Sequence, residues 1–172
     1  MPSFLETLSS RGQTLATCES LTAGLLSATI ASYPGASAVF QGGLVTYSAA
    51  LKTQLAGVPA ELIDAHGMVS AECAEAMATG TRSALGVDYA LALTGVAGPT
   101  VQEGNPVGVV WLALAGPEGV VSTRVLPEGQ TRWALRTDAT EPEEVLDGSR
   151  NEIRQRAALF ALDFFESHLN GN

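Results

Sequence analysis

Strand-like segments alternate with helix-like segments along the chain, and this alternation limits the possible folds more than any other feature. The apolar, β-branched runs that predict strands lie at 14–18, 38–47, 88–94, 107–115 and 120–125. The amphipathic runs that predict helices lie at 3–11, 20–33, 49–55, 59–65, 70–85 and 149–169. Strands that alternate with helices favour a layered α/β fold, in which the last two strands form a hairpin.

The length and composition fit one domain over residues 1–172. Apolar residues make up 46% of the chain and charged residues 16%. A chain of this size can bury most of its apolar surface, so it needs neither a disulfide nor a structural metal to fold. The acidic stretch at 138–148 is the exception, and we expect it to be a solvated, mobile excursion.

Charge and hydropathy exclude two classes of partner. The net charge is −9 and the arginines are dispersed or lie near the C-terminus, whereas nucleic-acid binders carry a basic stripe. The chain has no run of about 18 apolar residues, which is the length of a membrane span. Its first residues lack the basic start and apolar run of a signal peptide. We therefore expect a cytoplasmic protein that binds neither nucleic acid nor a membrane.

The cysteines and histidines do not have the spacing of a metal or redox site. Cys18 and Cys73 match no zinc or redox pattern, and His66 and His168 belong to no metal-binding motif. We expect no metal and no cofactor. Cys18 lies close to Ser20 and could compete with it as a nucleophile, but its place inside a strand favours a buried packing role. A Ser-His-Asp triad would need His66, which lies in a predicted turn.

Ser20 is the first candidate for chemistry, because it follows a predicted strand and opens a predicted helix. Serine is a good N-cap, and the free N–H groups at a helix start favour negative charge. Such a position can stabilise an oxyanion or hold a phosphate. On position alone, a simple capping role for Ser20 remains open.

Lys52 is the second candidate, and it is the only lysine beside eight arginines. It is also the only charged residue between Ser20 and Ala60. A desolvated lysine without a carboxylate partner has a lowered pKa, and arginine cannot replace a lysine that must lose its proton. Tyr47, at the end of the predicted strand, could orient Lys52 or relay a proton. A solvated surface lysine and a tyrosine at a sheet edge are the alternatives.

The loop at 94–108 is rich in glycine and has free backbone donors. It could contribute to a phosphate or ribose site, although it does not match the P-loop pattern.

Six segments together resemble the CinA C-terminal domain family, whose stand-alone members include nicotinamide-nucleotide amidases. The segments run in order through nearly the whole chain: ATCESLTAGLL (16–26), GGLVTYSAALKTQLAGV (42–58), HGMVSAECAEAMA (66–78), ALTGVAGP (92–99), PVGVVWLAL (106–114) and SRNEIRQRAALFAL (149–162). The resemblance implies a three-layer α/β/α sandwich around a mixed sheet. It also implies Ser20 as nucleophile, Lys52 as base, Tyr47 in support, and Arg150 as a residue that binds or polarises the substrate.

The expected activity is deamidation of nicotinamide mononucleotide by a Ser-Lys mechanism, with a small nucleotide as substrate and a homo-oligomer as the assembly. The further substrate-binding candidates come from the serine segment and the glycine loop: Thr22, Gly24, Thr94, Gly95, Gly98 and Asn105.

Three positions depart from the family pattern. Ala23 stands where the serine segment often has a glycine, Ser149 where the final segment often has an aspartate, and Asn105 where a lysine often precedes Pro-Val-Gly. The loss of that lysine is expected to weaken phosphate binding. These departures leave open an amidase with another substrate, or a catalytically silent module that binds a nucleotide or a partner.

Overall fold

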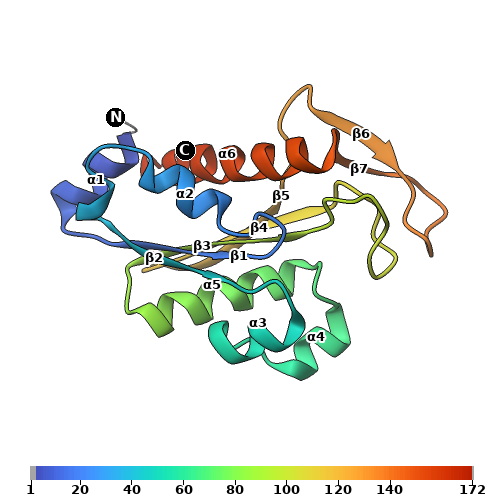
Figure 1. Cartoon of the computed structure of the whole chain (residues 1–172), viewed down its shortest axis with the longest axis horizontal. Coiled ribbons are helices and arrows are strands. Elements are labelled where there is room, and N and C mark those ends of the chain that lie inside the picture. Colours follow the sequence, from blue (N-terminus) through green and yellow to red (C-terminus); the bar gives the residue numbers. More distant parts are fainter. Residues whose placement is uncertain (1–2, 172) are drawn as a thin grey trace.

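A mixed five-stranded sheet forms the middle layer of the computed structural model, which describes residues 3–171 (Figure 1). The strand order is β2-β1-β3-β4-β5. The strands are β1 (Leu15–Glu19), β2 (Phe40–Val45), β3 (Tyr89–Gly95), β4 (Val110–Gly116) and β5 (Gly119–Arg124). β1 pairs in parallel with both β2 and β3, while β3–β4 and β4–β5 are antiparallel. The β4–β5 pair is the predicted hairpin.

Helices cover both faces of the sheet, so the predicted three-layer α/β/α sandwich is confirmed (Figure 1). One outer layer contains α1 (Ser3–Arg11), α2 (Leu25–Ala31) and α6 (Arg150–Leu169). The other contains α3 (Ala49–Ala56), α4 (Ala60–His66) and α5 (Ala71–Leu85). A short 3₁₀ turn, Ala36–Ala38, precedes β2.

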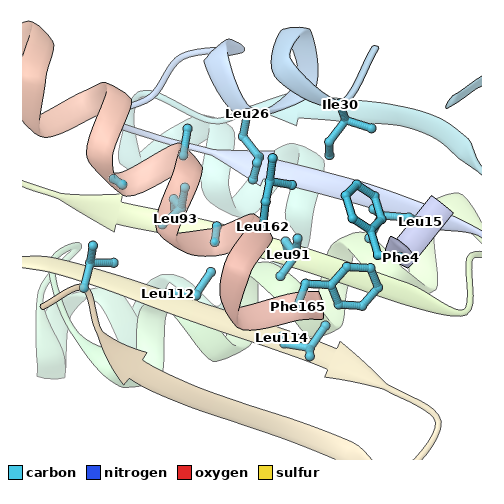
Figure 2. Close-up of a cluster of buried hydrophobic side chains, with 14 of the residues drawn as sticks. Phe4, Leu15, Leu26, Ile30, Leu91, Leu93, Leu112, Leu114, Leu162 and Phe165 are labelled. Atoms are coloured by element: carbon cyan, nitrogen blue, oxygen red, sulfur yellow. The ribbon is translucent and has the colours of Figure 1, made fainter. Parts of the chain in front are cut away.

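The side chains of the central strands are larger on one face of the sheet than on the other. This difference determines how closely each helix layer approaches the sheet. Leu91 and Leu93 of β3 join Phe165 in the larger apolar cluster below α6 (Figure 2). On the opposite face Ala92 packs beside α5 in a second cluster of small residues. Alternate side chains of a strand point to opposite faces, so this pattern lets α5 approach the sheet closely.

Gly80 of α5 brings α3 close to α5. A Cβ atom at this position would lie 1.6 Å from the carbonyl oxygen of Ala56 in α3. Only glycine therefore permits this contact, and the contact fixes the helix that carries Lys52.

The chain connections place a crevice at the carboxyl ends of β1 and β3. From its carboxyl end β1 leads through α2 to β2 on one side, whereas β3 leads to β4 on the other side. Neighbouring strands whose connections leave in opposite directions form a topological switch point, where α/β proteins bind their ligands.

The prediction that a helix starts at Ser20 is wrong, because α2 begins at Leu25. Ala23 has a φ of 48° and Gly24 a φ of 94°, so both are left-handed and interrupt a right-handed helix. Ser20 is therefore not an N-cap, and it lies in a turn between β1 and α2.

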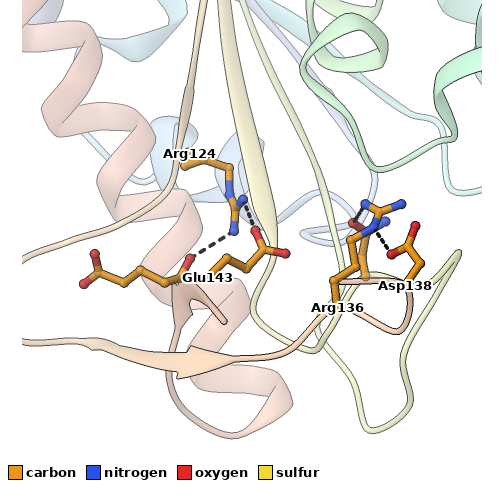
Figure 3. Close-up of polar contacts among 6 residues, drawn as sticks. Arg124, Arg136, Asp138 and Glu143 are labelled. Atoms are coloured by element: carbon orange, nitrogen blue, oxygen red, sulfur yellow. Dashed lines mark hydrogen bonds and ion pairs between the residues drawn. The ribbon is translucent and has the colours of Figure 1, made fainter. Parts of the chain in front are cut away.

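The acidic stretch at 138–148 is also corrected in part, because it includes a strand. β7 (Glu143–Leu146) pairs antiparallel with β6 (Thr131–Ala134), and Val145 and Leu146 are buried. Figure 3 shows the ion pairs that hold this segment: Arg124 contacts Glu143 at 2.6 Å, and Arg136 contacts Asp138 at 2.7 Å. The apolar residues Val145 and Leu146 pack into the protein and make a fully solvated excursion unfavourable.

Candidate active site

Ser20 and Lys52 meet at the carboxyl end of β1. The Nζ of Lys52 lies 2.9 Å from the Oγ of Ser20 and donates a second hydrogen bond to the carbonyl oxygen of Thr46 at 2.7 Å. Lys52 reaches this point from α3, which starts at the N-cap Ser48. A hydrogen bond also joins the backbone N–H of Ser20 to the carbonyl oxygen of Leu93 in β3. The nucleophile candidate is thus fixed by two strands and one helix.

Lys52 is fully buried, and this burial lowers the pKa of its ammonium group below the ordinary value. The charges of Cys73, Cys18 and Glu103 oppose this change in pKa but act less strongly than burial. Within residues 3–171, no carboxylate forms an ion pair with Lys52. Burial therefore raises the share of the neutral amine, which is the form that can accept a proton.

Glu19 holds the turn after Ser20 from the α2 side. Its buried carboxylate accepts hydrogen bonds from the N–H groups of Gly24, Leu26 and Ser27 at 2.8–3.0 Å, and from the hydroxyl of Ser27 at 2.6 Å. Glu19 thus occupies the first N–H groups of α2, so this helix end is not available to a substrate. Sequence reasoning missed this role, although an acidic residue just before a helix is a recognisable sign.

A cavity of about 300 Å³ opens beside Ser20. Five further candidates from the sequence line it with Ser20: Tyr47, Thr94, Gly95, Gly98 and Arg150. The lining also contains residues that the sequence did not single out: Leu21, Met68, Val69, Val96, Ala97, Thr100, Val101 and Gln102. Lys52 is buried and does not line this cavity, but it contacts Ser20, which does.

Arg150 spans the cavity between Tyr47 and Gly98. Its guanidinium donates a hydrogen bond to the hydroxyl oxygen of Tyr47 at 2.8 Å and another to the carbonyl oxygen of Gly98. Tyr47 is 55% exposed. It forms no hydrogen bond with Lys52, whose partners are Ser20 and Thr46. Both side chains are thus placed to contact a bound molecule rather than the base.

Three predicted substrate-binding residues lie outside this cavity. Thr22 is fully buried, and Gly24 is the N-cap of α2. Asn105 is 4% exposed, and its side-chain oxygen accepts a hydrogen bond from Arg136 at 2.7 Å. It lines neighbouring hollows with His66 and Arg136. The structure therefore separates Asn105 from the serine.

Both cysteines are buried and have raised pKa values. Burial raises the pKa of Cys18 and raises that of Cys73 to about 11. Cys18 lies within β1 and is fully covered. Because the thiolate is the reactive form, Cys18 is a poor competitor of Ser20.

The arrangement can activate a hydroxyl for attack on a carbonyl carbon. A serine within hydrogen-bond reach of a base is the signature of an activated nucleophile. The cavity offers one cation, Arg150, and several backbone groups for substrate contacts. Across residues 3–171, no helix is both long and apolar enough to cross a bilayer.

Curated relatives match the chain over most of its length. A competence-damage inducible protein of Limosilactobacillus fermentum is 47% identical over 135 residues, which cover 78% of this chain and 33% of that protein. A CinA-like protein of Frankia casuarinae is 43% identical over 161 residues, which cover 94% of this chain and 33% of that protein. The chain thus spans about a third of the length of these relatives.

Solved structures match the whole fold. A CinA superfamily protein of Klebsiella pneumoniae superposes with a TM-score of 0.84 at 28% identity, covering 99% of this chain and 96% of that one. The competence/damage inducible protein CihA of Agrobacterium tumefaciens gives a TM-score of 0.79 at 30% identity, with 98% and 92% covered.

The family model described as the CinA C-terminal domain matches residues 2–143. This range includes Ser20, Tyr47 and Lys52, while Arg150 follows it. The resemblance inferred from six sequence segments is confirmed, and the chain belongs to the CinA C-terminal domain family.

Proposed function

We propose that the protein is an amidohydrolase that converts nicotinamide mononucleotide to nicotinate mononucleotide and ammonia. The observation that carries this proposal is the contact of 2.9 Å between the Nζ of Lys52 and the Oγ of Ser20. Lys52 is buried, and its pKa is lowered by that burial. A general base that works near neutral pH needs such a change.

In the first half of the reaction, neutral Lys52 takes the proton of the Ser20 hydroxyl as Oγ attacks the amide carbon. The carbonyl electrons move to oxygen and form a tetrahedral oxyanion. Lys52 then gives its proton to the amide nitrogen, the C–N bond breaks, and ammonia leaves. An acyl ester on Ser20 remains.

In the second half, water takes the place of ammonia. Lys52 accepts a proton from the water as its oxygen attacks the ester carbon, and it returns that proton to Oγ as the acyl group leaves. The net change is the addition of one water and the release of ammonia and a carboxylate. Every proton transfer in this sequence is between Lys52 and Ser20, water or the leaving nitrogen.

The lining of the cavity supports a substrate with an anionic part. Arg150 is the one charged side chain among the lining residues described, and its guanidinium can bind a phosphate or polarise a carbonyl. Tyr47 presents an exposed aromatic ring beside it. A flat pyridine ring can pack against such a ring.

The test is to incubate the pure protein with nicotinamide mononucleotide and to measure ammonia and nicotinate mononucleotide. A panel of other small amides and Ser20→Ala are run in parallel. Hydrolysis that depends on Ser20 supports the proposal. Turnover of another amide alone would change the substrate, and no turnover of any amide would favour a silent binding module.

A further inference from the structure

Two backbone N–H groups next to Ser20 have no partner. Within residues 3–171, neither a backbone nor a side-chain acceptor is bonded to the N–H of Leu21 or of Thr22. The side chain of Leu21 belongs to the buried apolar core, although Leu21 also lines the cavity. Leu21 thus lies where the apolar core meets the cavity wall.

Arg154 of α6 holds the carbonyl groups of the same two residues. Its Nε donates to the carbonyl oxygen of Leu21 at 2.9 Å, and its Nη2 donates to that of Thr22 at 3.0 Å. The remaining nitrogen bonds to the side chain of Asn151 at 3.2 Å. One guanidinium from a helix more than a hundred residues away thus fixes two consecutive peptide groups of the turn.

Because each peptide group is planar, fixing its carbonyl also fixes the direction of its N–H. The C=O of Leu21 and the N–H of Thr22 share one planar peptide and point in opposite directions. The C=O of Thr22 fixes the N–H of Ala23 in the same way, and that N–H bonds to the carbonyl oxygen of Ser20 at 3.2 Å. This last bond fixes the peptide that carries the N–H of Leu21.

We propose that the N–H of Leu21, a residue of the cavity wall, is an oxyanion donor, and that Arg154 positions it by holding the turn after Ser20. Thr22 is fully buried and lies outside the cavity, so its N–H is not such a donor. The inference rests on the proposed attack by Ser20. The N–H that follows a nucleophilic serine on a strand-to-helix turn is a recurrent oxyanion donor. A preoriented donor stabilises the charge that develops on the carbonyl oxygen, without a reorganisation cost at the moment of reaction.

Arg154 is not a lining residue of the cavity, so its loss acts on the transition state rather than on substrate binding. We expect Arg154→Ala to lower kcat by about 10²-fold, the typical effect of losing an oxyanion donor, with KM nearly unchanged. Arg154→Lys can donate to the two carbonyls only through one nitrogen, so its kcat should lie between those of the wild type and of Arg154→Ala. Added guanidinium ion should partly restore kcat in Arg154→Ala but not in the wild type.

The matched control is Arg156→Ala on the same helix. Arg156 contacts the carbonyl oxygen of Asp147 and pairs with Glu152, and neither residue lies in the cavity wall. Its kcat and KM should match those of the wild type. Thermal unfolding of each variant identifies any loss of activity that follows from loss of the fold.

A fluorophosphonate probe separates this inference from the choice of substrate. The probe forms an Oγ–P bond with an activated serine, fluoride leaves, and the phosphoryl oxygen needs the same donor. We expect Arg154→Ala to be labelled at Ser20 far more slowly than the wild type, whether or not nicotinamide mononucleotide is hydrolysed. Equal labelling rates in folded protein, or a rise in KM without a fall in kcat, would overturn the role of Arg154. A wild type that is not labelled at Ser20 would overturn both proposals.

Discussion

The Nζ of Lys52 lies 2.9 Å from the Oγ of Ser20, although 32 residues separate them in the chain. Lys52 donates one other hydrogen bond, to a carbonyl oxygen, and no carboxylate compensates its charge in residues 3–171. A lysine held in this way is costly to keep protonated. The pair therefore has the properties of a base beside its nucleophile, and the predictions below test that relationship first.

Lys52→Arg should lower kcat by at least about 10²-fold, because general-base catalysis typically contributes 10²–10⁴-fold and arginine stays protonated. The measurement is steady-state ammonia release, with circular dichroism to verify the fold. The wild-type rate should rise with pH as Lys52 loses its proton, whereas the residual rate of the variant should not follow that curve. A fully active Lys52→Arg protein would falsify the Ser-Lys mechanism.

Ser20→Ala should remove hydrolysis and leave the fold intact. Ser20 caps no helix, and the turn around it is held by Glu19 and Arg154, so the free energy of unfolding should change little. Cys18→Ala is the control, because Cys18 is buried and has a raised pKa. If Cys18→Ala were inactive and Ser20→Ala active, the nucleophile would be Cys18 instead of Ser20.

The stability of the protein should depend on pH through Lys52. Because burial lowers the pKa of Lys52 in the folded state, the unfolded chain binds more protons between that lowered pKa and the ordinary value of about 10.4. The free energy of unfolding rises with pH over this window. Denaturant unfolding of the wild type and of Lys52→Met should therefore diverge, with the wild type gaining relative stability as pH rises.

The two cysteines have the opposite effect on how the free energy of unfolding depends on pH. Their raised pKa values make the folded chain bind more protons than the unfolded chain at alkaline pH. Because the charge of Lys52 also acts on both thiols, the two proteins are compared below about pH 8, where the thiols stay largely protonated in the folded and the unfolded chain. Parallel curves for the two proteins would mean that the pKa of Lys52 is not lowered.

Ala23→Gly should stabilise the protein. The φ of 48° at Ala23 is left-handed, which costs an L-residue about 1–2 kcal/mol, part of which glycine loses again through the entropy of the unfolded chain. We expect a net gain of about 0.5–1 kcal/mol in denaturant unfolding, with activity retained. Gly24→Ala is the matched control, because its φ of 94° makes a loss of stability the expected result.

Asn105→Lys should destabilise the protein rather than improve binding of the nucleotide. Asn105 is buried and accepts a hydrogen bond from Arg136, so a lysine would put two positive charges together and leave a donor unpaired. The loss should be about 2 kcal/mol, the order of a hydrogen bond to a charged group. Asn105→Asp keeps the acceptor and should retain stability. A stable Asn105→Lys protein with a lower KM would instead place this residue at the phosphate.

Local patterns in the sequence predicted the sheet, and the family resemblance implied the three layers. Ser20 and Lys52, which the structure brings into contact, were selected from their positions and from residue types that few others can replace. Solitary Lys52 and Ser20 after a strand were both recognisable. The start of α2 was predicted wrongly, since serine often caps a helix while two left-handed residues cannot be read from sequence alone. Arg154 was not singled out, because its role depends on a contact between α6 and a distant turn.

The predicted role of Asn105 rested on a family pattern in which a lysine stands at that position. In three dimensions Arg136, from a segment with no strong sequence signal, bonds to the asparagine instead. The buried part of the acidic stretch escaped prediction for a similar reason. Val145 and Leu146 are only two apolar residues among charged ones, and their burial depends on pairing with β6.

The switch point between β1 and β3 separates the parts of the cavity that can diverge in evolution from the parts that cannot. Ser20 and Lys52 are supported by the turn after β1 and by α3, whereas the loop after β3 supplies the wall at 96–102. Loops on a rigid scaffold tolerate insertion and substitution. A lineage with this fold could thus reshape the cavity wall by changing that loop alone, while Ser20 and Lys52 keep their positions.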